Sequence, residues 1–233
     1  MNKYSHGTEM ILDAFFKAFE SALSNYEAAS VLTEQKYISQ ASSLSILSLE
    51  EVGKMMLLDG LLFAKTGDER YKQYKHGHLS HRMKLDGMEL YPLFLRYLNT
   101  IDPRRNENRY KQTLLIIFED LKAKRQDLAD LLGDGFVFSD LDKYKQQGFY
   151  SHEAEGILKA NNEAIDPKVA NALLVLTWRV TDTLKFVLGQ SLEYYKSFVH
   201  ESRKRIDEVR LKVIRSEATK IVESIFEIDT EKS

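Results

Sequence analysis

The stretch YISQASSLSILSLEEVGKMMLL, residues 37–58, decides the fold class. Its first thirteen residues carry no charge, and its apolar residues recur at the spacing of a helix. Only three prolines occur in 233 residues, so long stretches are free of the strongest helix breaker. No alternating run of apolar and polar residues indicates a strand. The sequence therefore predicts an all-α protein.

Glu50, Glu51 and Lys54 interrupt this apolar stretch. Steps of three or four residues place Glu51 and Lys54 in line with leucines that should face the core. A simple interpretation is an intrahelical ion pair on a solvated edge, which contributes about 0.3–0.5 kcal/mol. Because nearly every neighbour is apolar, we expect at least one charge to be partly buried and to need a partner. The spacing alone favours neither a structural ion pair nor a functional site.

A basic, histidine-rich segment follows. Residues 65–84 contain six Lys or Arg against two acids, and three of the chain's six histidines. His81 and Lys84 are three apart and share a helical face. The segment is either a solvated helix start or a source of cations for the glutamates.

A metal site is a further alternative for the same residues. His76, His78 and His81 offer imidazole donors, and Glu50 or Glu51 could add oxygen ligands. A di-iron bundle needs two Glu-x-x-His motifs on different helices, and the chain has none. The surrounding lysines and arginines also repel a cation. We expect neither a metal nor another cofactor.

The rest of the chain also has helical patterns, with turn signals between them. The first expected helix starts at Thr8. Three more are expected over residues 33–65, 78–99 and 107–132, the second of these with a kink or break at Pro92. A last helical stretch is expected from Asp166-Pro167 to about residue 228, with a division near Gly189. Residues 136–166 are expected to be a packed loop with short helical turns. The apolar face of the first helix should comprise Ile11, Phe15, Phe16, Phe19, Leu23 and Tyr26.

Composition limits location and partners. The chain has 33 basic against 35 acidic residues, so any nucleic-acid surface must be local. It has no cysteine, no N-terminal signal pattern and no run of about 18 apolar residues. We expect a cytoplasmic protein that binds neither membrane nor DNA.

Three short motifs make the sequence similar to the AbiV-type abortive infection proteins of the HEPN superfamily. LEEVGK at 49–54 resembles the family's Glu-Glu-x-Gly-Lys helix, and HRMK at 81–84 resembles its His-x-x-Lys. KQQGFY at 145–150 resembles its Lys-x-x-Gly-apolar-Tyr. The motifs occur in the expected order and cover about residues 8–152.

The chain departs from the family pattern at two places. Members commonly continue after the tyrosine with an apolar residue and an aspartate, whereas this chain has Ser151 and His152. The general HEPN ribonuclease signature is an arginine followed four to six residues later by a histidine, and only Arg70 and His76 fit that spacing.

The resemblance implies a HEPN-like helical bundle over residues 1–166, with C-terminal helices over 167–233 that pack on it or extend from it. It implies a homodimer that acts against phage by attacking RNA or blocking translation, with a phage or host protein as a further partner. The implied reaction is metal-independent: a ribose 2′-hydroxyl attacks the adjacent phosphate in a cleft between protomers.

The resemblance also implies roles for individual residues. His81 would be the general acid and base, and Lys84 would hold the phosphate. Glu51 and Lys54 would orient the histidine or hold its protonation state. The supporting residues would be Glu50, Arg82, Lys145 and Tyr150. Arg82 would help Lys84 to hold the phosphate, and Tyr150 would donate a hydrogen bond.

Two other functions stay open at this point. One is a binding module of the same fold that holds a nucleotide or a partner protein without catalysis. The other is a metal-dependent bundle enzyme, which would purify with bound metal.

Overall fold

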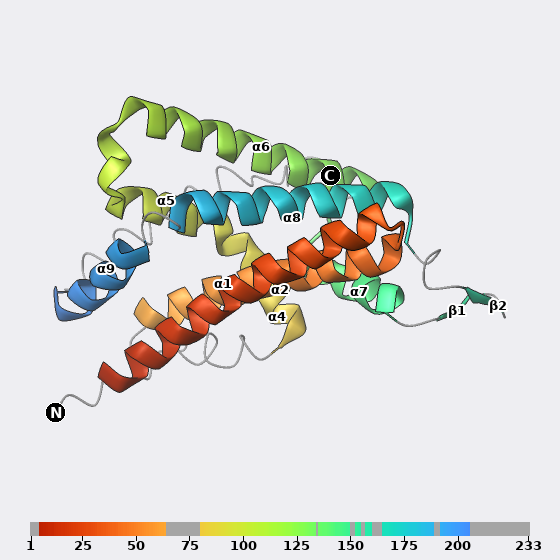
Figure 1. Ribbon diagram of the computed structural model, residues 1–233, viewed down its shortest axis with the longest axis horizontal. Coiled ribbons are helices and arrows are strands. Elements are labelled where there is room, and N and C mark those ends of the chain that lie inside the picture. Colours follow the sequence, from red (N-terminus) through yellow and green to blue (C-terminus); the bar gives the residue numbers. More distant parts are fainter. Residues whose placement is uncertain are drawn as a thin grey trace, which may run out of the picture.

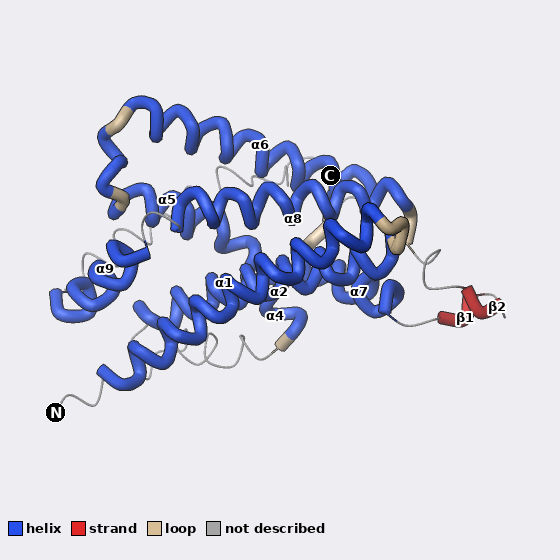
Figure 2. Tube along the Cα trace, viewed as in Figure 1, coloured by secondary structure: helices blue, strands red, loops and turns tan. Residues whose placement is uncertain are grey.

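The computed structural model describes residues 5–63, 80–133, 135–149, 152–154, 157–159, 165–188 and 192–205. Helices dominate these residues, which confirms the predicted all-α class (Figures 1 and 2). The elements in chain order are α1 (Ser5–Glu34), α2 (Ile38–Phe63), α4 (His81–Gly87), η1 (Met88–Leu90), α5 (Tyr91–Ile101), η2 (Pro103–Asn106), α6 (Asn108–Leu132), η3 (Phe138–Asp140), α7 (Leu141–Phe149), β1 (His152–Ala154), β2 (Ile157–Lys159), α8 (Pro167–Leu188) and α9 (Leu192–Arg205).

Helix α2 is the centre of the bundle. Helices α1, α4, α7 and α8 all pack against it. Its buried residues therefore cover most of its circumference, and the partly exposed ones form one narrow stripe that includes Leu44, Leu47, Glu51 and Lys54.

The connection between α1 and α2 differs from the prediction. The second helix was expected to start at Thr33, but α1 continues to Glu34, and the Thr33 hydroxyl donates to the Ala29 carbonyl inside it. Lys36 then takes a left-handed conformation (φ 66°) that closes the turn. A lysine gives no sequence signal for such a turn, which glycine or asparagine usually makes. Thr8 likewise lies inside α1 instead of capping it.

The buried face of α1 is also rotated from the expected one. Of the six predicted residues, Phe15 is fully buried while the other five are only partly buried. Alanines at 18, 22 and 29 take their place in the core. Small side chains let the two helices approach so closely that the Ser48 hydroxyl of α2 donates to the Ala22 carbonyl at 2.6 Å.

Later boundaries follow the turn signals. The expected break near Pro92 is confirmed, because η1 separates α4 from α5 and Pro92 lies in the first turn of α5. Helix α6 ends at Gly133 (φ 104°), and the Asp166 carboxylate caps α8 by accepting from the Lys168 amide at 2.7 Å. The predicted division near Gly189 lies between α8 and α9. The expected end of the second helix near residue 66 and the helical pattern beyond 205 lie outside the described residues.

Residues 136–166 hold more regular structure than predicted. Helix α7 is nine residues long, and β1 and β2 pair in antiparallel register with His152 opposite Lys159. Strands this short give no readable alternation, which is why the sequence missed them.

The C-terminal helices pack onto the bundle. Helix α8 contacts α1, α2 and α6, so residues 167–188 belong to its core. Tyr195 of α9 stacks on Phe15, with 5.0 Å between ring centroids, and its hydroxyl donates to Asp59 at 2.7 Å. Across the described residues, no helix has the length and apolar character needed to cross a membrane.

Candidate functional site

Helix α4 crosses α2 at a pair of glycines. A Cβ atom on Gly53 would overlap the Lys84 carbonyl oxygen, and one on Gly87 would lie 2.5 Å from the Gly53 carbonyl oxygen. Any larger residue at either position would push the helices apart. The glycine of LEEVGK therefore brings the start of α4, with His81 and Lys84, onto the charged turn of α2.

Helix α7 crosses α2 in the same way, about three to four turns earlier on α2. A Cβ atom on Gly148 would overlap the Ser43 hydroxyl and the Ser39 carbonyl oxygen. The Ser43 hydroxyl donates to the Lys145 carbonyl oxygen at 2.8 Å, which fixes α7 against α2. The lysine and glycine of KQQGFY thus act together, because the glycine allows the approach that brings Lys145 to α2.

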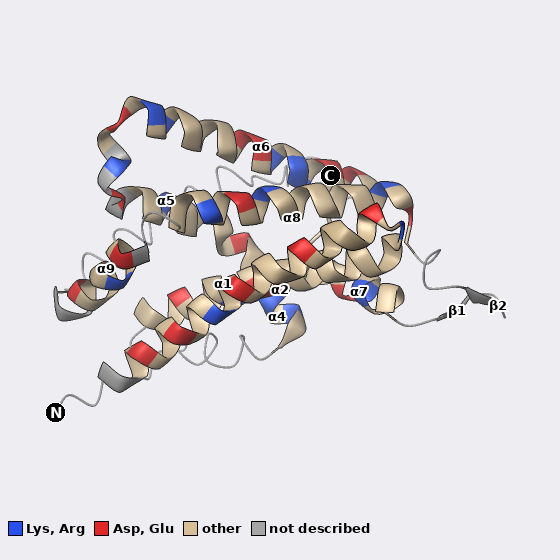
Figure 3. Ribbon diagram, viewed as in Figure 1, with Lys and Arg blue, Asp and Glu red and all other residues tan. Residues whose placement is uncertain are grey.

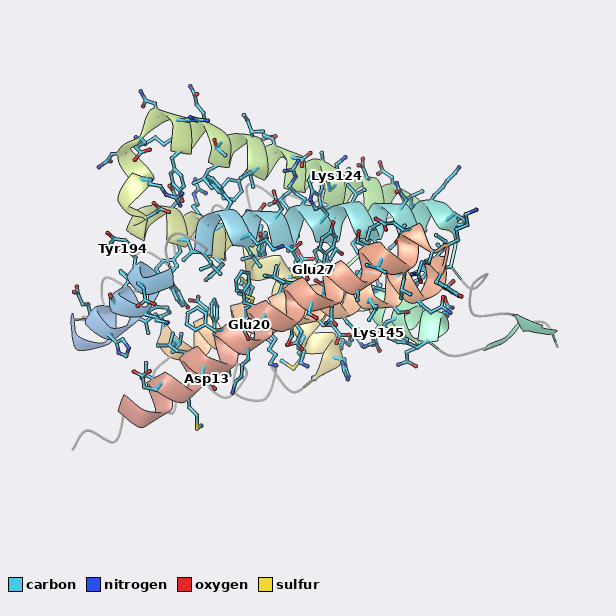
Figure 4. All side chains as sticks on the ribbon, viewed as in Figure 1. Asp13, Glu20, Glu27, Lys124, Lys145 and Tyr194 are labelled. Carbon is cyan, nitrogen blue, oxygen red and sulfur yellow. The ribbon has the colours of Figure 1, made fainter. Side chains whose placement is uncertain are left out.

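Glu50 lies where the three helices meet. Only 1% of the residue is exposed. One carboxylate oxygen accepts from the Lys145 ammonium, and the other lies 2.7 Å from Nδ1 of His81. Lys145 also pairs with Asp142 at 2.7 Å, three residues earlier on α7. Glu50 therefore links α7 to α4 through two hydrogen bonds (Figure 4 labels Lys145).

Glu51 makes a second, more accessible set of contacts. Its carboxylate lies 3.0 Å from the Lys54 ammonium and 3.8 Å from that of Lys84. The sequence interpretation expected Glu51 and Lys54 to orient His81, and the structure corrects this, since Glu50 contacts the imidazole. The row that contains Leu47, Glu51 and Lys54 is only partly buried, because the neighbouring helices cover the other sides of α2, where Glu50 lies.

These contacts define the charged cluster, and all three motifs contribute to it. Its members are Glu50, Glu51, Lys54, His81, Lys84, Asp142 and Lys145. Figure 3 shows basic residues on α4 and α7 beside α2. Asp142 was not predicted, although its position three residues before Lys145 on a helix was the available signal.

Burial divides the charged cluster into an inner and an outer part. The side chain of Lys145 is 9% exposed, whereas that of His81 is 62% exposed. Burial acts to lower the pKa of Lys145, but hydrogen bonds to Asp142 and Glu50 outweigh it, so this pKa lies above its ordinary value. The inner part is thus a fixed ion pair, and the imidazole reaches solvent from it.

The three carboxylates of the charged cluster are balanced by three lysines. Further positive charge can come from Arg82, which is exposed beside His81 and has no ion pair within the described part of the chain. Tyr150 lies outside the described residues, as do His76, His78 and Arg70.

The alternative metal site involves His76 and His78, which lie outside the described residues, together with His81 and a glutamate. Where the structure describes the chain, no three His, Cys, Asp or Glu side chains are grouped so as to hold a metal ion. Glu50 and His81 are instead bound to each other, and Glu50 to a lysine.

A hollow elsewhere on the surface has a different character. It lies between α6 and α8 and is lined by Lys124, Asp127, Lys168 and Asn171, among others. It shares no residue with the charged cluster, and Lys124 is already paired with Asp127.

Comparison with known proteins agrees with the three motifs. The family model HEPN_AbiV, described as AbiV, matches residues 10–181. The match covers well over half of the chain, includes all three motifs and extends into α8. No curated protein and no solved structure matches the chain.

Proposed function

We propose, because this chain belongs to the AbiV family of HEPN proteins, that it cleaves RNA without a metal ion at the charged cluster. Membership in this family implies abortive-infection defence against phage. RNA cleavage is the finer step that we add from the arrangement of His81 and its neighbours.

The observation that carries the proposal is the contact between His81 and Glu50. A buried carboxylate beside Nδ1 holds the imidazole in one orientation, and its other nitrogen, Nε2, is left for a substrate. A histidine held in this way is the usual general acid and base near neutral pH. His81 is exposed enough to reach RNA.

The proton transfers balance at this single nitrogen. The ribose 2′-hydroxyl attacks phosphorus and gives its proton to Nε2 of neutral His81. The bond from phosphorus to the 5′ oxygen then breaks, and the imidazolium returns the proton to that oxygen. The products are a 2′,3′-cyclic phosphate and a 5′-hydroxyl end.

Lys84 is the cation best placed to hold the phosphate. It lies one helical turn from His81, and its ammonium is 3.8 Å from Glu51, too far for a hydrogen bond. Its N–H donors are therefore available to phosphate oxygens. Arg82, exposed between the two, can add a second cation.

The direct test measures RNA ends after incubation with the purified protein and EDTA. We expect 2′,3′-cyclic phosphate ends from the unchanged chain and none from His81→Asn. His200→Asn is the matched control, because His200 is also an exposed histidine paired with a glutamate, Glu9. Cleavage that survives in His81→Asn, or that requires a divalent metal, would remove the proposal.

A non-catalytic binding module is the second candidate, and the charge balance of the cluster favours it. Every lysine in the cluster has a carboxylate nearby, as in a structural network that ties α2 to α4 and α7. In that case His81→Asn would leave both growth inhibition in cells and partner binding unchanged.

A second copy of the chain would complete the site. His81 and Arg82 are exposed in one protomer, whereas phosphoryl transfer is favoured where water is excluded. We therefore propose that two copies meet over α4. Sedimentation that shows only monomer at micromolar concentration would contradict a shared cleft.

A further inference from the structure

The hydrogen bonds around Glu50 have a fixed direction. The Lys145 ammonium can only donate, so the Glu50 oxygen that it contacts must accept. An ionised carboxylate has no proton to give, so its second oxygen must also accept, and the donor is Nδ1–H of His81. Lys145 and His81 therefore both donate hydrogen bonds to the buried Glu50 carboxylate.

Burial makes Lys145 necessary for this direction. Glu50 is almost completely excluded from water, and a buried carboxylate without a cation is neutralised by taking up a proton. A protonated carboxyl could donate to Nδ1 and reverse the bond. Asp142 holds the Lys145 ammonium from the other side, at 2.7 Å.

We propose that Lys145 is a positioning residue that fixes the tautomer of His81 through Glu50. The neutral imidazole carries its proton on Nδ1, and Nε2 presents its lone pair to solvent. Histidine in water prefers the opposite tautomer, with the proton on Nε2, so the network has an observable effect. Its importance for catalysis rests on the proposed function, because only an unprotonated Nε2 can take the 2′-hydroxyl proton.

Nuclear magnetic resonance of the full chain with ¹⁵N-labelled histidine tests the proposal, since long-range ¹H–¹⁵N correlations distinguish the tautomers of a neutral ring. His81→Asn identifies the signals of His81. We expect the Nδ1–H tautomer in the unchanged chain. The Nε2–H tautomer there would overturn the proposal, whether or not RNA is cleaved.

Glu50→Gln should reverse the tautomer of His81, although the glutamine side chain has nearly the same size and shape as glutamate. The amide oxygen of glutamine must face the donor-only Lys145, which leaves the amide NH₂ facing Nδ1, so the ring proton moves to Nε2. Lys145 keeps Asp142 as a charged partner in this variant. Glu51→Gln is the matched control for the spectrum, because Glu51 contacts two lysines and not His81.

Lys145→Met should also shift His81 toward the Nε2–H tautomer, through neutralisation of Glu50. Should this variant fail to fold, Glu50→Gln alone still decides the question. Under the proposed function, Glu50→Gln also lowers kcat about 10²–10⁴-fold with little change in KM. Reversal of the tautomer without any RNA cleavage in the unchanged chain would remove the proposed function and keep this inference. An unchanged His81 tautomer in Glu50→Gln would overturn the inference that Lys145 fixes the tautomer through Glu50.

Discussion

Gly53 of α2 and Gly87 of α4 lie directly against each other, so that a Cβ atom on Gly87 would come within 2.5 Å of the Gly53 carbonyl oxygen. Real Cβ atoms do not approach that closely. The crossing has room for two hydrogen atoms and nothing larger. The position of the His81 and Lys84 side chains thus depends on a backbone crossing to which neither side chain contributes, although the Lys84 carbonyl lies in it.

Gly53→Ala should destabilise the protein and displace α4. The new methyl group would overlap the Lys84 carbonyl oxygen, and backbone atoms cannot move aside as a side chain can. We expect a loss of about 3 kcal/mol in the free energy of unfolding, measured from the urea midpoint.

Gly7→Ala is the control for this substitution. Gly7 is also in a helix, and an added Cβ atom would meet nothing within 4 Å, so stability should stay the same or rise. Equal midpoints for Gly53→Ala and the unchanged chain would mean that α2 and α4 do not pack as closely as described.

The sequence contained part of this arrangement. The charges at Glu50, Glu51 and Lys54 stood out because they interrupt an apolar helix, and burial of one of them could be predicted from its neighbours. Which glutamate is buried could not be predicted, because that depends on α7, whose approach is set by Gly148 almost a hundred residues later. Hydrophobic periodicity describes the faces of a single helix, whereas the burial of each face of α2 depends on which of α1, α4, α7 and α8 packs against it.

Lys145→Met should be far more costly than removal of a surface lysine. It removes the cation that lets Glu50 stay ionised in the core, and loss of one partner of a buried ion pair typically costs about 3–5 kcal/mol. Lys124→Met is matched to it, because Lys124 also pairs with an aspartate three residues away but on an exposed face. That change should cost less than about 1 kcal/mol.

The double variant Glu50→Gln with Lys145→Met should recover part of the loss, because a glutamine amide needs neither a cation nor a proton to be buried. Urea unfolding of the four proteins checks this. A loss in Lys145→Met no larger than that in Lys124→Met would show that Glu50 does not depend on Lys145.

Stability should fall at alkaline pH through Tyr195. Burial, together with the nearby charge of Asp59, raises the pKa of Tyr195 well above its ordinary value. The unfolded chain loses this phenol proton near pH 10, while the folded chain keeps it. The stability that the proton contributes is therefore complete below about pH 10 and is lost as pH rises above it, by up to about 1.4 kcal/mol per pH unit.

Tyr195→Phe should flatten this alkaline slope by that amount, although it lowers stability at neutral pH by removing the hydrogen bond to Asp59. Urea midpoints between about pH 9 and 11 give the slope. Tyr91→Phe should flatten it similarly, since burial also raises the pKa of Tyr91. Slopes that stay the same in both variants would contradict this origin.

The aromatic contacts of α9 are a second case in which the sequence predicts a buried residue but not its packing partner. Phe15 was predicted as a core residue from its spacing on the first helix. Its stacking partner, Tyr195, comes from the far end of the chain, and nothing in the local pattern of either helix indicates the pair. Alanines 18, 22 and 29 were overlooked for a related reason, because the value of a small residue depends on the helix that packs against it.

Glu51→Gln should strengthen RNA binding, although it changes a residue of the charged cluster. Glu51 neutralises Lys54 and Lys84, so loss of its charge leaves one more positive charge for phosphate. Glutamine can still accept a hydrogen bond from Lys54, and the fold should persist. Each added phosphate contact steepens the dependence of log Kd on log salt by about 0.7 for single-stranded RNA.

Lys84→Gln should do the opposite, with weaker binding and a salt slope lower by about 0.7. Glu119→Gln, an exposed glutamate of α6 outside the cluster, should change neither quantity. Fluorescence titration of a short RNA at several salt concentrations measures all three variants. Weaker RNA binding by Glu51→Gln than by the unchanged chain would contradict this prediction. It would mean that Glu51 holds Lys54 and Lys84 in position for RNA, and does not compete with phosphate for them.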